Sequence, residues 1–201
     1  MSVIFVFVDG VGAGRPDPAV NPLAREPFLL SRFEDGSGAP LPGGGRAGLA
    51  DARLGVEGRP QSATGQTTIL TGENAPVLLG KHLLGFPNPR LRELLERRSI
   101  YRRLAEAGRR AVFANAYPVA YLRALGFPVE GEPEFSLPRR VRASATTVAF
   151  AAGGGAFRTF ADARAGRGLT HDLTARRAYL RRQAISAGRR GAAESFRKAR
   201  P

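Results

Sequence analysis

The stretch GRPQSATGQTTILTG, residues 58–72, decides how we interpret this chain. Its residues from Ser62 to Leu70 predict a helix that begins near the serine and ends before Gly72. The N-terminus of a helix favours negative charge, so a serine hydroxyl placed there is a candidate nucleophile. The alternative interpretation of the same spacing is that Ser62 only caps the helix.

A second stretch, the apolar run VIFVFV from Val3 to Val8, predicts a strand buried on both faces of a parallel sheet. Asp9 follows at the carboxyl end of that strand, where ligands gather in open α/β sheets. A divalent cation there would activate a nearby hydroxyl, so we expect Asp9 and Ser62 to bind metal together. The alternative is that Asp9 only forms a turn.

The helix after Ser62 carries further candidates for binding a phosphate. Gly65 would keep the first turn open to a phosphate, and the side chains of Thr64 and Gln66 could donate hydrogen bonds to it. Thr64 is also the second choice of nucleophile. The candidate catalytic residues are therefore Ser62 and Thr64, and the candidate binding residues include Gly65 and Gln66.

Helical and strand patterns alternate further along the chain, which is typical of an α/β fold with a mostly parallel sheet. Asn115 follows the second predicted strand, at its carboxyl end, and is a candidate substrate contact; a turn residue is the alternative. Residues 15–60 look irregular. The remaining predictions are a short helix within Pro27–Phe33, a loop at Gly36–Gly45, a long helix at Asn88–Ala107, a short buried strand at Ala111–Ala114, and a helix at Ala143–Ala152 closed by three glycines.

The composition excludes several classes of protein. The 201 residues contain no cysteine, which removes disulfides and thiolate metal sites. No apolar stretch approaches the roughly 18 residues that span a bilayer, so we expect a cytoplasmic protein without a membrane partner. The net charge is +14, but residues 151–201 hold 12 Lys and Arg against 3 Asp and Glu, a balance of +9. This concentration in one end argues against nucleic acid as the general partner.

The motifs VFVDG and QSATGQTTILTG together resemble the alkaline phosphatase superfamily of metalloenzymes, which includes phosphoglycerate mutase and phosphopentomutase. Ser62 precedes the pair Thr71-Gly72 by nine positions, as the nucleophile does in that superfamily. GKHLLGFPNPRLRELL and VFANAYP resemble its small bacterial branch, so that the likeness covers roughly residues 1–175. It implies a three-layer sandwich and two manganese or zinc ions. It also implies Asp9 as a metal ligand, Ser62 as nucleophile and metal ligand, and a small phosphorylated substrate.

The sequence departs from the superfamily in its second half, which should supply further Asp and His ligands. The two histidines are His82, without an acidic neighbour, and His171, in an Asp-His pair of reversed order. Asp9 and Ser62 alone are too few ligands for two ions. We therefore expect either an active phosphoryl-transfer enzyme or a truncated, inactive remnant. Residues 176–201 read as a basic tail, helical or disordered, which in the alternative interpretation binds nucleic acid or an acidic surface.

Overall fold

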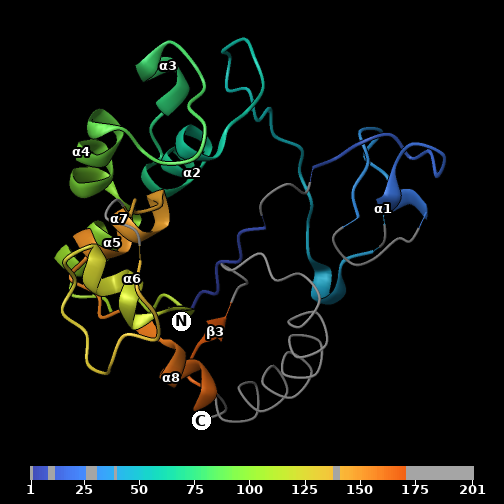
Figure 1. The fold of residues 1–201 in the computed structure, drawn as a ribbon. Helices are drawn as coiled ribbons and strands as arrows, with labels where there is room; N and C mark the ends of the chain where they lie inside the picture. Colours follow the sequence, from blue (N-terminus) through green and yellow to red (C-terminus); the bar gives the residue numbers. More distant parts are fainter. Residues whose placement is uncertain (1, 9–11, 26–30, 39, 138–140, 171–201) are drawn as a thin grey trace.

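Helices dominate the described part of the chain, and short parallel strands join them at one end (Figure 1). The computed structural model describes residues 2–8, 12–25, 31–38, 40–137 and 141–170. In these ranges the helices are α1 (Pro22–Arg25), the 3-10 helix η1 (Pro42–Gly44), α2 (Ser62–Thr71), α3 (Ala75–Leu79), α4 (Pro89–Arg98), α5 (Ile100–Glu106), α6 (Val119–Ala124), α7 (Ala145–Ala152) and α8 (Phe160–Arg164); the strands are β1 (Asn115–Tyr117), β2 (Arg158–Thr159) and β3 (Leu169–Thr170).

The three strands of the described residues form a small, all-parallel sheet in the order β2-β1-β3. Ala116 of β1 is in register with Arg158 of β2, and Asn115 is in register with Leu169 of β3. Because parallel neighbours need crossover connections, this sheet with its intervening helices gives the chain an α/β character, as predicted.

The helical core forms where α2 packs against α3, α4 and α7. Leu70 and Leu95 lie in one buried cluster with Val148 and Ala149. A second cluster joins Ala63 of α2 to Ala75 and Leu91. The alanines let the helix backbones approach closely, so that α2 is covered on several sides rather than on a single apolar stripe.

Aromatic side chains link the helical core to the sheet. The Phe150 ring of α7 meets the rings of Tyr101 at 5.2 Å, Phe113 at 5.5 Å and Phe157 at 5.1 Å between centroids. Such offset and edge-on pairs stabilise a core beyond the apolar area that they bury. The Tyr117 hydroxyl lies 3.3 Å from Thr147 Oγ1, which adds a polar link between β1 and α7.

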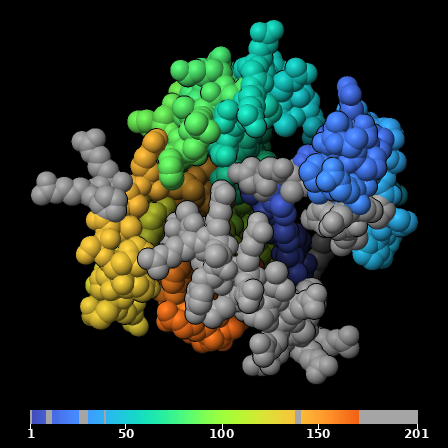
Figure 2. All heavy atoms as spheres, turned by 45° about the vertical axis from the view of Figure 1, so that its right-hand side comes forward, coloured from blue at the N-terminus to red at the C-terminus, as the bar shows by residue number. Residues whose placement is uncertain are grey.

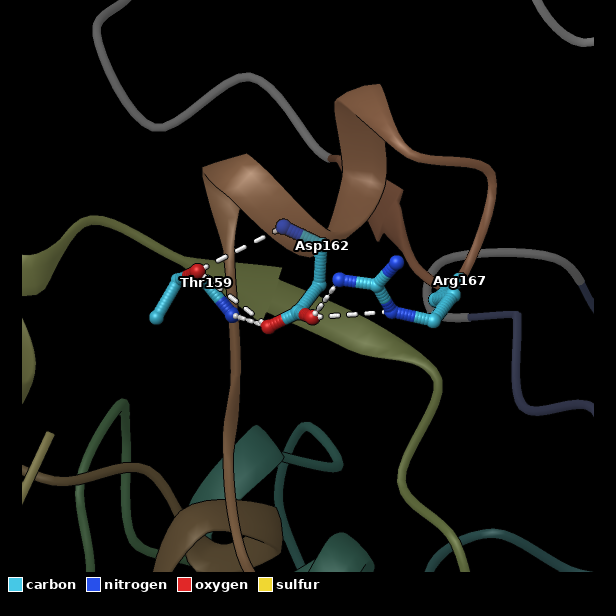
Figure 3. Close-up of polar contacts among 3 residues, drawn as sticks. All are labelled: Thr159, Asp162 and Arg167. Carbon is cyan, nitrogen blue, oxygen red and sulfur yellow. Dashed lines mark hydrogen bonds and ion pairs between the residues drawn. The ribbon is translucent and has the colours of Figure 1, made fainter. Parts of the chain in front are cut away.

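Helix α8 is held by a polar cluster that Figure 3 shows. The Asp162 carboxylate accepts hydrogen bonds from the Thr159 amide at 2.9 Å and from Arg167 at 2.8 Å, while the Asp162 amide donates to Thr159 Oγ1. This reciprocal arrangement is a capping box. Hydrogen bonds from the Thr159 amide and from Arg167 hold the pKa of Asp162 below its usual value, because they favour the charged carboxylate.

The prediction of a buried strand at Val3–Val8 is wrong: the segment forms no strand and its side chains lie exposed. Val3 is 76% exposed and Ile4 is 80% exposed. A buried parallel strand needs neighbours of similar length on both sides. The sheet of the described residues has strands of two or three residues, which are too short to pair with this run.

The predicted helix Asn88–Ala107 is also corrected, because it is two helices. Pro89 opens α4 as expected, with Asn88 as its cap, but the helix ends at Arg98. Ser99 is extended and its side chain caps α5 by accepting a hydrogen bond from the Arg102 amide. The local sequence favours one helix, and the cap at Ser99 divides it.

One smaller prediction is wrong, one is tested only in part, and two are confirmed with adjusted bounds. Ala111–Ala114 is not a strand; β1 begins at Asn115, so Asn115 lies within a strand rather than after one. Of the predicted helix within Pro27–Phe33, residues 31–33 are not helical and residues 27–30 lie outside the described residues. The helices predicted near Ser62 and near Ala143 are present as α2 and α7.

Residues 12–60 lie largely beside the helical core that α2, α3, α4 and α7 form. In the space-filling view of Figure 2 the lighter blue residues form a lobe to one side of the green and orange ones, whereas the dark-blue residues at the start of the chain lie nearer the middle of the view. Among the described residues, residues 12–60 contain only α1 and η1 as helices, in agreement with the predicted irregular excursion. Of the helices in the described ranges, none combines the length and the apolar character that crossing a bilayer requires.

Candidate functional site

Ser62 is the first residue of α2. Gln61, with φ −133° and ψ 150°, occupies the N-cap position, and no side chain caps the helix there. The Gly65 amide donates to the Gln61 carbonyl at 2.9 Å and closes the first turn. The interpretation of Ser62 as the cap is therefore wrong. Its hydroxyl lies, half-buried, at the positive end of a ten-residue helix.

The other hydroxyls of α2 hold the helix together. Thr67 Oγ1 donates to the Ala63 carbonyl at 2.6 Å, and Thr71 Oγ1 donates to the Thr67 carbonyl at 2.7 Å. Thr68 Oγ1 accepts from the Ala75 amide at 3.0 Å, which joins α2 to the start of α3. These bonds let polar side chains lie in an apolar core without an unsatisfied group. Much of the TTILT segment therefore has a structural role.

Thr64, the second choice of nucleophile, is fully buried. Its Oγ1 donates to the Gln61 carbonyl at 3.2 Å and accepts from the Leu83 amide at 3.3 Å. The Ala63 amide donates to the Leu83 carbonyl at 3.1 Å. Thr64 and Ala63 thus fix the segment around Leu83 to the first turn of α2. A hydroxyl engaged in this way is poorly placed to attack a substrate, and the geometry favours Ser62.

Gly65 and Gln66 follow on the same helix, both half-buried. A Cβ added at Gly65 would meet no atom within 4 Å, so the space beside this residue is open. The structure therefore brings four of the predicted residues together on one helical turn and its continuation: Ser62, Thr64, Gly65 and Gln66.

The loop that leads to Ser62 is tied down at two points. The His82 Nε2 atom lies 3.2 Å from the Val56 carbonyl oxygen, and Asn74 Nδ2 donates to the Leu54 carbonyl at 2.9 Å. Residues 57–60 are exposed and have no regular secondary structure. The sequence had indicated no role for His82. The signal that was available is its position directly after the turn at Gly80, close to the helix that carries Ser62.

The main packing contacts of the strand that carries Asn115 do not involve α2. Asn115 is half-buried in β1, which packs against β2, β3 and α8, whereas α2 packs against α3, α4 and α7. The Arg142 guanidinium lies 4.8 Å from the centre of the Phe86 ring, in a cation–π contact. Asn115 as a substrate contact stays a prediction.

The predicted metal ligand Asp9 lies outside the described residues, and so does His171. Within the ranges that the structure describes, no three His, Cys, Asp or Glu side chains lie together as a metal ion would need. The described residues near Ser62 therefore do not by themselves fit a two-metal site, and we derive no chemical step through a metal.

Comparison of this chain with models of known protein families, with curated proteins and with solved structures finds no match in any of the three. The candidate function consequently depends on the residues and their geometry.

Proposed function

We propose that this chain transfers a phosphoryl group from a small phosphate ester, with Ser62 as the nucleophile. The observation that supports it is the position of Ser62 as the first residue of a long, well-packed helix, at the end of an exposed loop. The helix N-terminus stabilises both the developing alkoxide and a phosphate dianion. With this function we propose the relationship to the alkaline phosphatase superfamily, including its three-layer sandwich.

The reaction balances as two displacements at phosphorus. Ser62 Oγ attacks the phosphorus atom in line with the ester oxygen; the new Oγ–P bond forms while the P–O ester bond breaks. The leaving alkoxide takes up the proton that the serine hydroxyl releases. Water then attacks the phosphoserine and yields inorganic phosphate and free Ser62. A second substrate hydroxyl in place of water would make the reaction a mutase reaction.

The proposal includes a divalent cation, manganese or zinc, bound through Asp9 and Ser62. Such an ion would supply charge stabilisation and lower the pKa of the attacking hydroxyl. The contribution of the described residues is separate: α2 orients Ser62, Gly65 leaves room beside the helix, and Gln66 would donate hydrogen bonds to phosphate oxygens.

The test is hydrolysis of p-nitrophenyl phosphate by the full chain with manganese, with zinc and with a chelator. We expect metal-dependent turnover that falls by at least about 1,000-fold in Ser62→Ala. Trapping of a phosphorylated tryptic peptide that contains Ser62 would identify the nucleophile. Ser136→Ala, at an exposed loop serine, is the matched control and should retain the activity. Turnover that is equal in Ser62→Ala and wild type would refute the proposal.

A further inference from the structure

We propose that His82 is a positioning residue, which holds the loop Val56–Gln61 in place and thereby aims Ser62. The inference rests on the proposed function for its kinetic consequence, but its structural part stands on contacts alone. His82 and Ser62 are each one residue away from the backbone hydrogen bond that joins Ala63 to Leu83.

These contacts form a closed path of covalent and hydrogen bonds that passes through Ser62. From Ser62 the path runs to Ala63, across the hydrogen bond of 3.1 Å to Leu83, and back one residue to His82. The His82 imidazole then reaches the Val56 carbonyl oxygen at 3.2 Å, and the chain returns from Val56 to Ser62. Leu83 is held in place on this path, because the Leu83 amide also donates to buried Thr64. His82 therefore links the loop to a fixed base.

The loop needs this link at its Val56 end, because its other end is already fixed by the two hydrogen bonds that the Gln61 carbonyl accepts in the first turn of α2. Residues 57–60 are exposed and lack regular structure. Gly58 has φ +109°, a conformation that residues with a side chain rarely adopt. A Cβ at Gly58 would come within 3.6 Å of His82 Cδ2, so the ring also packs beside the loop at this glycine. His82 therefore contacts the loop at two places, the Val56 carbonyl and the space beside Gly58.

The direction of the hydrogen bond is determined by its partner. A carbonyl oxygen only accepts, so Nε2 must carry the proton that it donates to Val56. The neutral ring is then the Nε2–H tautomer, with its lone pair on Nδ1. This tautomer is a property of the wild-type protein that can be measured without any substrate.

Backbone ¹⁵N relaxation tests the link in His82→Ala, His82→Gln and the matched control Lys81→Ala, an exposed neighbour. We expect order parameters of the amides of Glu57, Gly58 and Arg59 near about 0.8 in wild type and Lys81→Ala, and below about 0.6 in His82→Ala. His82→Gln, which keeps a donor, should restore them. Unchanged order parameters in His82→Ala would overturn the proposal.

Two further measurements separate this inference from the proposed function. If His82→Ala does not fold, the ring ¹⁵N shifts of wild-type His82 decide: a neutral ring protonated mainly on Nδ1 would overturn the link. In the phosphatase assay, kcat should fall about 10- to 100-fold in His82→Ala with little change in KM, and His82→Gln should recover most of it. If wild type has no turnover, the proposed function fails, while the order parameters and tautomer still decide the role of His82.

Discussion

Ser99 Oγ donates a hydrogen bond to the carbonyl oxygen of Ala149 at 3.2 Å, between residues 50 positions apart. Ser99 Oγ also accepts a hydrogen bond from the Arg102 amide and so caps α5. Ser99 is fully buried. One side chain thus divides the Arg-rich helical segment into α4 and α5 and joins the division to α7.

Ser99→Ala should therefore destabilise the fold by about 1–3 kcal/mol, because it removes a helix cap and leaves a buried carbonyl without its partner. Urea denaturation followed by far-UV circular dichroism measures the change. Ser136→Ala, in an exposed loop, should stay within about 0.5 kcal/mol of wild type. Equal effects of the two substitutions would contradict the buried role of Ser99.

The division at Ser99 also shows why the fold could be predicted only in part. The predicted helix start at Asn88 lies one residue before the observed start of α4 at Pro89, because the signal that proline gives for a first turn is local. The end of α4 depends on a partner in α7 that no local pattern reveals. The predicted strand at Ala111–Ala114 lies too early in the chain for a similar reason: the observed strand β1 forms where its partners β2 and β3 pair with it, at Asn115–Tyr117.

The substitution Gly65→Ala tests whether this glycine leaves room for a phosphate or only for the packing of α2. Because an added methyl group meets no atom within 4 Å, the substitution should stabilise α2 by about 0.5–1 kcal/mol. If a phosphate approaches the first turn, the same methyl group should lower kcat/KM for p-nitrophenyl phosphate by about tenfold or more. Thermal denaturation and the phosphatase assay, run on the same preparation, measure both effects.

The matched control is Gly153→Ala, at the end of α7. There a Cβ would lie 2.8 Å from the Tyr101 carbonyl oxygen, so this substitution should destabilise the fold by about 1–3 kcal/mol. A stabilising Gly153→Ala, or a destabilising Gly65→Ala, would show that the packing around these helices differs from the one described.

Thr64→Val and Thr64→Ser distinguish the two hydroxyls at the start of α2. Thr64→Val removes the acceptor of the Leu83 amide and should cost about 1–3 kcal/mol of stability. Because Ser62 is the proposed nucleophile, the folded fraction of Thr64→Val should still form the phosphorylated intermediate. Thr64→Ser should be close to wild type in both respects. Loss of the intermediate in Thr64→Val, with Ser62→Ala active, would exchange their roles.

Asp162 makes the stability of the α8 region depend on pH. Its folded-state pKa is lowered below the usual value of about 3.9, so its contribution is present above the unfolded pKa and is lost as the pH falls through the folded pKa. Asp162→Ala should be less stable than wild type near neutral pH, and the difference should shrink in acid. Urea titrations at several pH values measure it, with exposed Glu132→Ala as the control. A difference that is constant with pH would contradict the ionised role of Asp162.

The candidate site was predictable to the extent that it lies on one continuous helix. The spacing from Ser62 to Gly72 correctly placed a helix start and an end, and Gly72 takes the left-handed conformation with φ 77°. What the sequence did not reveal are the contacts between segments: the pairing of Ala63 and Thr64 with Leu83, and of His82 with Val56. These bonds join residues 19 to 26 positions apart and follow from packing rather than from any local propensity.

The enclosure of α2 by α3, α4 and α7 has a consequence for how the protein responds to heat. A helix covered by three neighbours cannot open alone, because its exposure would also uncover the core that they share. Ser62 would then keep its position until α2, α3, α4 and α7 unfold together. Gradual warming should therefore produce a single sharp loss of turnover that coincides with the melting of the helices, rather than an earlier fading of activity.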